Sequence, residues 1–463
     1  MKSRPVANIQ RFSFIQGDTI VLQRITKRIT KFRDGVLRGG KMLLVICVSV
    51  IFYIFFTNFY QSATFYFKGN LLFLLLYIFI LCCFMLTYGC FKIGEASIQD
   101  LLFSFCLATL ITNIVGFLTI CLFARALLKI YPSLIAYILQ ITFAVPAYWG
   151  LHYEFRKLHP LKHAIGIISN SDYEMGIINK YYKNNAHLAI DELVPEPQKI
   201  EEIYDVLDRY SAIVIGHIQL PLRDAIFLYA FQRNKKVIVL PSPHDILFNS
   251  AKPFIFEDSL IYNFRDHVFS ADQLMIKRIT DVIISVFLIV ISFPIWLIAM
   301  IGIKCTDGGP IFFKQTRLTR NGQCFNLIKF RSMIIDAEKD TGAIQAVKND
   351  KRITNIGRFI RSTRIDELPQ LINIIKGDMS LVGPRPERPE MYDIICNECP
   401  EFKMRLNVKA GLTGYAQIHG KYSTSHEDKL RMDLFYIERA NWLVDIQLML
   451  STIKVIFIKG KSE

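Results

Sequence analysis

Two adjacent carboxylates, Asp366 and Glu367, are the side chains of this sequence best placed for chemistry. They come just before Pro369, which suits the first turn of a helix that we expect to run to about Lys376 and to stop at Gly377. At the N-terminus of that helix, the dipole and the free N–H groups favour negative charge on a carboxylate or a bound phosphate. By local rules alone, however, Asp366 is better interpreted as a simple N-cap.

Basic side chains crowd the same part of the sequence and alter that interpretation. They are Lys329, Arg331, Arg352, Arg358, Arg361, Arg364, Arg385 and Arg388. Several stand beside turn-forming residues, as in Gly383-Pro384-Arg385-Pro386, where the turn fixes the backbone that carries the guanidinium. The guanidinium fork matches phosphate oxygens in pairs. A carboxylate pair among such cations indicates phosphoryl chemistry, in which one carboxylate is free to hold Mg²⁺.

Composition places this chemistry at a membrane. Of the 463 residues, 52% are hydrophobic and only 21% are charged, whereas an ordinary soluble protein has about 25% charged residues. The same figures exclude a disordered chain, a collagen-like repeat and a disulfide-rich secreted scaffold. Because 55 Lys and Arg face 40 Asp and Glu, the net charge is +15. A basic and apolar chain points to anionic partners such as lipid headgroups or phosphorylated substrates.

Four uncharged stretches come first: residues 42–60, 69–91, 101–124 and 130–151. Each is close to the ~20 residues that a helix needs to cross a bilayer, and a backbone in lipid must satisfy its own hydrogen bonds. The segment 1–41 is rich in Lys and Arg, which places it in the cytoplasm. Four crossings then return the chain to the cytoplasm.

A fifth apolar run, residues 282–303, has basic residues at both ends, so the positive-inside rule assigns it no direction. Pro294 lies near its middle, where a proline removes a backbone hydrogen bond and bends a helix. We predict a re-entrant helix over 277–303 that enters the inner leaflet and returns. The alternative is a kinked fifth span, which would put all later residues outside the cell.

Residues 160–270 alternate short apolar runs with helical ones, and this alternation predicts a parallel, Rossmann-like sheet. We expect strands at 164–168, 187–190, 212–215 and 236–240, with helices at 173–182, 200–210 and 222–232. The first strand runs into Gly166-Ile-Ile-Ser-Asn-Ser and lacks the glycine-rich turn of a nucleotide site. We therefore interpret this domain as a regulatory or assembly surface rather than a cofactor-binding domain.

From residue 277 onward the sequence carries six motifs in order. They are Lys277-Arg-Ile-Thr-Asp281, Phe312-Phe-Lys-Gln-Thr-Arg317, Lys329-Phe-Arg-Ser-Met333, Asp366-Glu-Leu-Pro-Gln370, Gly377-Asp-Met-Ser-Leu-Val-Gly-Pro-Arg-Pro386 and Gly411-Leu-Thr-Gly-Tyr-Ala-Gln417. With them, this region resembles the bacterial polyprenyl-phosphate hexose-1-phosphate transferases of the monotopic phosphoglycosyl transferase superfamily. By architecture alone, the earlier parts resemble the large subgroup that initiates exopolysaccharide, capsule or O-antigen synthesis.

The resemblance implies a transfer in two steps. Asp366 would attack the sugar-bearing phosphate of a UDP-sugar and expel UMP, while Glu367 helps to hold Mg²⁺. A polyprenyl (undecaprenyl) phosphate would then attack the covalent aspartyl phosphosugar, giving polyprenyl-diphosphate sugar. For the sugar, glucose or galactose is the common expectation in this subgroup.

The family pattern also assigns candidate substrate contacts. They are Lys329, Arg331, Arg361, Arg385 and Lys421. Lys421 stands where the family has an arginine, so the charge is kept and the fork is lost. Phe293 precedes Pro294 where the family often has a serine, and Ser292 lies one position earlier.

The sequence thus predicts a helical N-terminal bundle of four membrane spans, a Rossmann-like α/β domain, a re-entrant helix and a mainly helical α/β catalytic domain. The expected bounds are 1–41 for the basic segment, 42–151 for the spans, 160–270 for the sheet domain, 277–303 for the re-entrant helix and 304–463 for the catalytic domain. We expect the catalytic domain on the cytoplasmic side of the bacterial inner membrane, in contact with the lipid bilayer, and a homodimer is plausible from the same resemblance. Nucleic acid is not expected as a partner, because no binding motif for it is recognisable.

Two other functions remain open at this point. A membrane glycosyltransferase would move the sugar alone and release UDP instead of UMP. A catalytically silent polysaccharide-assembly protein would keep the domain without the activity, although the presence of both Asp366 and Glu367 argues against it.

Overall fold

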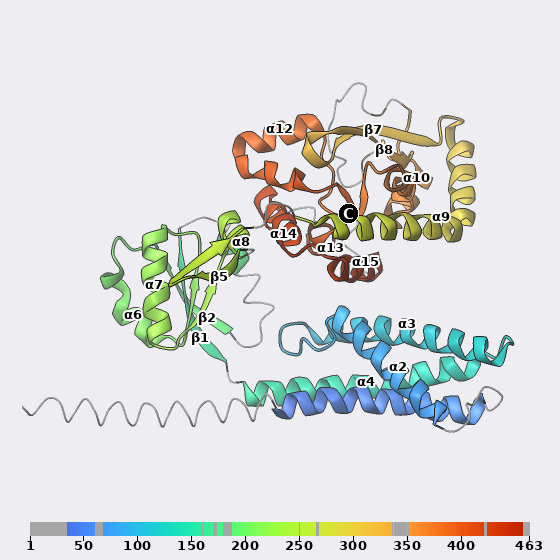
Figure 1. Cartoon of the computed structure of the whole chain (residues 1–463), viewed down its shortest axis with the longest axis horizontal. Helices are drawn as coiled ribbons and strands as arrows, with labels where there is room; N and C mark the ends of the chain where they lie inside the picture. Colours follow the sequence, from blue (N-terminus) through green and yellow to red (C-terminus); the bar gives the residue numbers. More distant parts are fainter. Residues whose placement is uncertain are drawn as a thin grey trace, which may run out of the picture. The chain divides into compact units, whose positions relative to one another are not determined.

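The computed structural model describes residues 35–60, 68–159, 161–169, 174–178, 188–249, 251–264, 268–335, 337, 350, 352–420 and 424–456. The chain divides into two compact units, Met1–Leu240 and Pro241–Glu463. The first contains apolar helices and a parallel sheet. The second contains the long helix α9 (Ala271–Asp307) and the short elements that carry the candidate site (Figure 1).

Four long apolar helices open the first unit: Gly35–Phe59, α2 (Gly69–Thr87), α3 (Ile98–Ala124) and α4 (Tyr131–Leu158). With α9 they make five helices, within the described residues, that are long and apolar enough to cross a membrane by length and composition. α3 packs against both α2 and α4. These helices cover the four uncharged stretches of the sequence and indicate association with a membrane.

A buried polar cluster joins these four helices. The Tyr77 hydroxyl donates to Asn113 Oδ1 at 3.0 Å, and Asn113 Nδ2 donates to Gln140 Oε1 at 2.7 Å. Gln140 Nε2 in turn donates to the carbonyl oxygen of Val48 and to the Tyr77 hydroxyl oxygen, each at 3.0 Å. Because an unsatisfied amide is costly in apolar surroundings, this closed set of bonds fixes the register of the helices.

The sheet of the first unit has the strand order β2-β1-β3-β4, and every neighbouring pair is parallel. Its strands are β1 (Lys162–Ile168), β2 (Leu188–Pro195), β3 (Ala212–Ile215) and β4 (Lys236–Val239). The intervening helices are η2 (Ile200–Ile203), α6 (Tyr204–Arg209) and α7 (Leu220–Gln232). Of the helix expected at 173–182, the described residues 174–178 are helical. The predicted parallel α/β domain is therefore confirmed.

A buried carboxylate lies at the carboxyl ends of the two central strands. Glu174 Oε2 accepts the N–H of Ser169, which follows β1, at 2.8 Å. Its Oε1 accepts the N–H of His217, which follows β3, at 2.7 Å. In nucleotide-binding sheets, the ligand lies in the crevice beside such strand ends, where the order reverses. Here a carboxylate of the protein itself accepts the N–H groups at these strand ends, and the regulatory or assembly role stays a prediction.

The second unit is mainly helical and contains three two-stranded sheets among its described residues. Its helices are α8 (Pro243–Phe248), α9, η3 (Arg320–Gly322), α10 (Asn355–Ser362), η4 (Ile365–Glu367), α11 (Gln370–Lys376), α12 (Pro389–Glu398), η5 (Pro400–Asn407), α13 (Tyr415–His419), α14 (His426–Arg439) and α15 (Trp442–Ile456). Its strands are β5 (Lys252–Phe256), β6 (Ser259–Asn263), β7 (Phe312–Leu318), β8 (Cys324–Phe330), β9 (Ser380–Val382) and β10 (Gly411–Thr413). This arrangement agrees with the mainly helical α/β domain that the sequence predicts.

The boundary between the units differs from the predicted one. The sequence pattern assigns residues 241–270 to the sheet domain, but the structure assigns them to the second unit. Ile246 of α8 belongs to the buried core of that unit, as do Leu430 and Leu434 of α14, against which α8 packs. A single turn of helix gives too weak a sequence pattern to reveal this packing.

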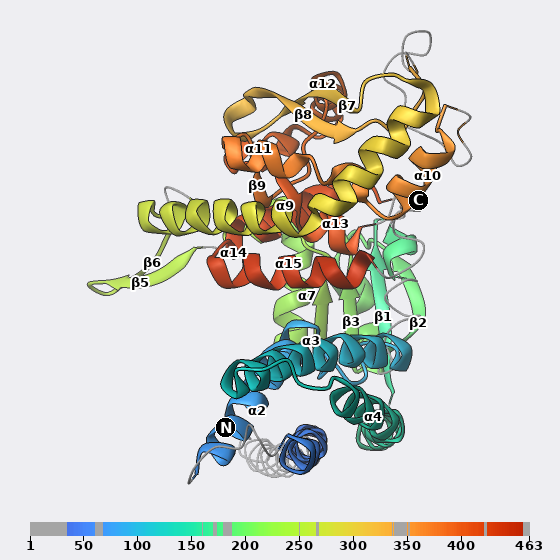
Figure 2. The same cartoon turned by 90° about the vertical axis from the view of Figure 1, so that its right-hand side faces the viewer.

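The helix α9 is longer than predicted and bent. It begins after Ser270, whose hydroxyl accepts the N–H of Gln273 in a capping box, and it ends at Gly308, which has a left-handed φ of 70°. Pro294 lies inside the helix, and both views show α9 turning partway along its length (Figures 1 and 2). A proline causes such a bend because it lacks the N–H for the carbonyl one turn earlier.

Ser292 supplies a polar contact at this bend, although Phe293 separates it from Pro294. Its hydroxyl donates to the carbonyl oxygen of Leu288 at 2.6 Å and accepts from Trp296 Nε1 at 3.1 Å. These two bonds connect the helical turns on both sides of the proline. The departure from the family pattern thus leaves a buried serine that stabilises the bent helix.

Candidate active site

The carboxylate pair lies in η4, a short 3₁₀ turn between α10 and α11. Arg364 precedes the turn with a left-handed φ of 57°, and its carbonyl oxygen accepts the N–H of Glu367 at 3.2 Å. As predicted, the following helix has Pro369 at its start and stops at Gly377, which has a φ of 99°. The pair therefore lies one turn ahead of α11 rather than within its first turn, and the left-handed Arg364 separates α10 from the turn that carries both carboxylates.

Glu367 is held by two of the predicted cations. Its Oε1 accepts from Arg385 Nη2 at 2.7 Å and from Lys329 Nζ at 3.3 Å. Burial raises the pKa of Glu367, but the charges of Arg385 and Lys329 outweigh it and hold that pKa well below its usual range. Both contacts use the same oxygen, so neither cation engages Oε2.

Asp366 has a different environment from its neighbour. Within the described residues, no hydrogen bond or ion pair fixes its carboxylate, and the side chain is partly exposed. Burial, followed by the negative charge of Glu367, raises the pKa of Asp366 to about 6, against the opposing charges of Lys329, Arg361 and Arg385. The two carboxylates thus differ: Glu367 is anchored by two cations, whereas no side chain among the described residues anchors Asp366.

Arg361 and Arg364 add positive charge around the pair. Arg361 lies in the last turn of α10, and its charge lowers the pKa of Asp366. Arg364 acts on Glu367. Its position two residues before Asp366 was visible in the sequence, but its role depends on the left-handed turn, which no local pattern specified.

One other predicted contact, Arg331, lies elsewhere. Arg331 is buried and forms a two-pronged ion pair with Asp307 at the end of α9, with Nη1 2.9 Å from Oδ2. It joins β8 to α9 in this structure and is not among the contacts of the carboxylate pair. Lys421 lies outside the described residues.

The motif at the start of the apolar run holds the strand that leads to Arg385. Lys277 Nζ donates to the Val382 carbonyl oxygen at 3.1 Å and pairs with Asp445 Oδ2 at 2.6 Å. Asp281 accepts from the hydroxyl of Ser380 at 2.8 Å. Both contacts fix β9 against α9, so the long apolar helix forms part of the scaffold of the site.

Arg278 of the same motif holds α11, the helix that follows the carboxylate pair. Its two terminal nitrogens donate to the carbonyl oxygens of Ile374 and Ile375, each at 2.6 Å. These carbonyls lie at the C-terminal end of α11, where the helix dipole favours a positive charge. The sequence identified this motif without its role, because the partners lie about a hundred residues further along the chain.

The side chains that could bind a metal ion determine which metal the site suits. Among the described residues, no group of three or more His, Cys, Asp or Glu side chains is arranged to hold a metal ion. The carboxylate pair alone suits Mg²⁺, which binds proteins through one or two carboxylates and completes its shell with water and substrate phosphates. A structural zinc site needs four protein ligands, and no group of the described residues supplies them.

Fold and site together define a class: a membrane-associated α/β domain whose unanchored carboxylate lies among cations suited to phosphate. Residues 272–459 match the family model described as bacterial sugar transferase. A putative undecaprenyl-phosphate N-acetylgalactosaminyl 1-phosphate transferase of Bacillus subtilis is 48% identical over 137 residues, which are 30% of this chain and 76% of the relative. The chain therefore belongs to the bacterial sugar transferase family, and the predicted family is confirmed.

Longer relatives match as well. An undecaprenyl-phosphate galactose phosphotransferase of Salmonella typhimurium is 33% identical over 241 residues, 48% of this chain and 49% of the relative. A UDP-glucose:undecaprenyl-phosphate glucose-1-phosphate transferase of Caulobacter vibrioides is 36% identical over 182 residues, 38% of this chain and 68% of the relative. The matched part of the chain spans about half or less of the length of the first relatives.

Proposed function

We propose that this chain transfers a hexose-1-phosphate from a UDP-sugar to polyprenyl (undecaprenyl) phosphate, releases UMP and forms a polyprenyl-diphosphate sugar. The observation that carries the proposal is the unanchored carboxylate of Asp366 beside Glu367, which Lys329 and Arg385 hold. The names of the matched relatives support the same reaction class. In the cell, this reaction would be the first membrane step of exopolysaccharide, capsule or O-antigen synthesis.

The transfer proceeds in two displacements at one phosphorus atom. First, an oxygen of Asp366 attacks the phosphorus that bears the sugar, and the bond to the bridging oxygen breaks, so that UMP leaves with the electron pair. Next, a phosphate oxygen of the polyprenyl phosphate attacks the same phosphorus, and Asp366 leaves as a carboxylate. Dividing the transfer lets the water-soluble donor depart before the lipid acceptor arrives.

The cations around the pair lower the electrostatic barrier to both displacements. Arg385 and Lys329 lie on one side of Glu367 and supply preorganised positive charge for the donor's phosphates. Arg361 supplies positive charge close to Asp366. Glu367 is the residue that would hold Mg²⁺, and the ion would neutralise charge on the diphosphate.

Product identity tests the proposed reaction. The full-length chain in membranes is incubated with undecaprenyl phosphate and, separately, with UDP-glucose, UDP-galactose and their N-acetylated analogues. We expect UMP release with at least one donor, in an amount equal to the polyprenyl-diphosphate sugar formed. Release of UDP would favour a glycosyltransferase, and the absence of any nucleotide release would favour a silent assembly protein.

For the membrane arrangement, we propose four spans, a re-entrant α9 and a cytoplasmic catalytic domain at the bacterial inner membrane. The bend in α9 and the basic residues at both of its ends support this arrangement. A re-entrant helix places the carboxylate pair close to the membrane surface, where a polyprenyl phosphate presents its headgroup.

Labelling of both ends of α9 tests this arrangement. Cys305 is a natural exposed probe near the C-terminal end, and Asp272→Cys adds one in the first turn. In chains whose other cysteines are replaced by serine, we expect neither probe to react with an impermeant maleimide in intact cells and both to react after permeabilisation. Leu127→Cys, between α3 and α4, is the control expected to react from outside. Labelling of Cys305 alone in intact cells would establish a full fifth span.

A further inference from the structure

The loop 383–387, which carries Arg385, is held through every one of its carbonyl oxygens. Backbone N–H groups of Gly411 and Leu318 bond the first proline and the last residue of the loop, at 2.8 and 3.0 Å respectively. Gln417 Nε2 donates to the carbonyl of Gly383 at 3.4 Å. The two remaining carbonyls, those of Arg385 and Pro386, accept from arginine side chains. The loop therefore has little freedom to move, and two prolines restrict it further.

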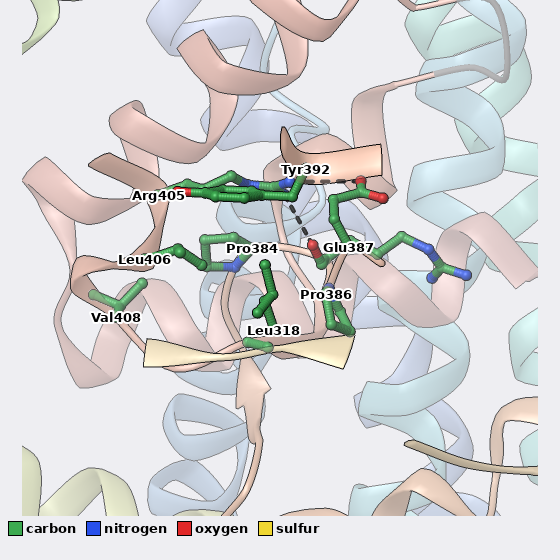
Figure 3. A pocket seen from close by; sticks show the side chains of 10 residues that line it. Leu318, Pro384, Pro386, Glu387, Tyr392, Arg405, Leu406 and Val408 are labelled. Carbon is green, nitrogen blue, oxygen red and sulfur yellow. Dashed lines mark hydrogen bonds and ion pairs between the residues drawn. The ribbon is translucent and has the colours of Figure 1, made fainter. Parts of the chain in front are cut away.

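One of these arginines, Arg405 of η5, is almost completely buried, with 3% of its surface exposed. Its Nη2 donates to the carbonyl oxygen of Arg385 at 2.9 Å and lies 2.8 Å from Asp433 Oδ2. Its Nη1 donates to Glu387 Oε1 at 3.5 Å. Figure 3 shows Arg405 alongside the loop, with a dashed line from its guanidinium to the carboxylate of Glu387.

This burial separates Arg405 from any substrate. A buried guanidinium needs nearby counter-charge, and Asp433, itself 1% exposed, supplies it from α14. The ring of Phe402 lies 4.5 Å from the guanidinium carbon and covers it further. Arg405 thus acts only on protein groups, and its contact closest to the site is the backbone of Arg385.

We propose that Arg405 is a positioning residue for the transfer: it fixes the backbone of Arg385 so that the Arg385 guanidinium meets Glu367 and the donor's phosphate. The proposal rests on the proposed function, in which Arg385 supplies charge to the diphosphate. The connection runs from Asp433 through Arg405 to the Arg385 carbonyl, and then through the Arg385 side chain to Glu367. Misplacing a catalytic charge by about 1 Å costs on the order of 100-fold in rate.

The conservative variant Arg405→Lys separates charge from geometry. Lysine keeps the positive charge near Asp433 but lacks the planar fork that reaches Asp433, Glu387 and the Arg385 carbonyl together. We expect a loss of about 10- to 100-fold in kcat/KM for UMP release. Arg431→Lys is the matched control: Arg431 is also largely buried and ion-paired, but with Glu427 and Asp428 on its own helix, and activity near wild type is expected.

A double-mutant cycle distinguishes positioning from general damage. If Arg405 acts through Arg385, adding Arg405→Lys to Arg385→Ala will lower the rate by less than about twofold beyond Arg385→Ala alone. Multiplicative losses would overturn the proposal, because they would mean that Arg405 acts independently of Arg385. Should Arg405→Lys fail to fold, Asp433→Asn replaces it in the same cycle, with the same dependence on Arg385 expected.

Hydrogen exchange gives a second measurement that does not depend on activity. In Arg405→Lys, the amides of Gly383, Arg385, Glu387 and Arg388 should exchange faster than in wild type and in Arg431→Lys, while α14 keeps its protection. Unchanged exchange in this loop would overturn the positioning role even if the wild-type chain releases UMP. Conversely, the wild-type chain could release no UMP while the loop of the variant exchanges faster. That result would overturn the proposed reaction, but it would establish that Arg405 fixes the backbone of Arg385.

Discussion

Asp366→Asn is expected to reduce turnover by roughly 10⁴- to 10⁶-fold, the scale of losses when a nucleophile is removed. Asparagine has nearly the same shape as aspartate, but its amide does not form the bond to phosphorus. Because the described residues provide no hydrogen bond or ion pair that fixes Asp366, the substitution leaves no new unpaired partner behind. The fold should therefore be preserved, and the loss should be chemical.

Mass spectrometry gives the sharper measurement for this variant. Wild-type chain incubated with its UDP-sugar donor, without acceptor lipid, should gain the mass of one hexose phosphate on the peptide that contains Asp366. Asp366→Asn should gain none. Asp393→Asn, an exposed aspartate on α12, is the control and should gain the same mass as wild type. Turnover that survives in Asp366→Asn would remove this residue from the role of nucleophile.

Local sequence patterns predicted the start and the end of the helix that follows the carboxylate pair. The stop at Gly377 and the start at Pro369 depend on neighbouring residues, and the structure has both. The convergence of Lys329 and Arg385 on Glu367 joins residues 38 and 18 positions apart. The family resemblance supplied Lys329 and Arg385 as phosphate contacts. Their contact with Glu367 was not predicted, since spacing along the chain does not specify which side chains meet.

Long-range packing explains what the sequence did not reveal. Arg331 carries the same charge as the site arginines, but its partner Asp307 lies 24 positions earlier, at the end of α9. The hold of Lys277 on Asp445 spans 168 positions. Arg405 stands in no motif that we recognised, and its importance follows only from burial beside the backbone of Arg385. Charge type is visible in a sequence, whereas the choice of partner requires the fold.

Glu367→Gln is expected to lower kcat by about 10²- to 10³-fold, the usual loss when one preorganised electrostatic group is removed. Glutamine keeps an oxygen that can accept from Arg385 and Lys329, so both contacts can persist in geometry. The net charge of the site changes, however. Without the negative charge of Glu367, the charges of Lys329 and Arg385 act on Asp366 uncompensated. The expected result is a correctly folded chain with impaired metal-dependent chemistry.

The magnesium titration of this variant decides whether Glu367 is a metal ligand or only an anchor for the two cations. As a ligand, its loss should raise the Mg²⁺ concentration for half-maximal rate by at least about tenfold, since altering even the outer partners of a metal site weakens binding 10- to 100-fold. Glu390→Gln, an exposed glutamate in the first turn of α12, should leave the titration unchanged. A lower maximal rate with an unaltered titration midpoint would assign Glu367 to holding Arg385 and Lys329 alone, and the Mg²⁺ would then have to be held by Asp366 and the donor's phosphates.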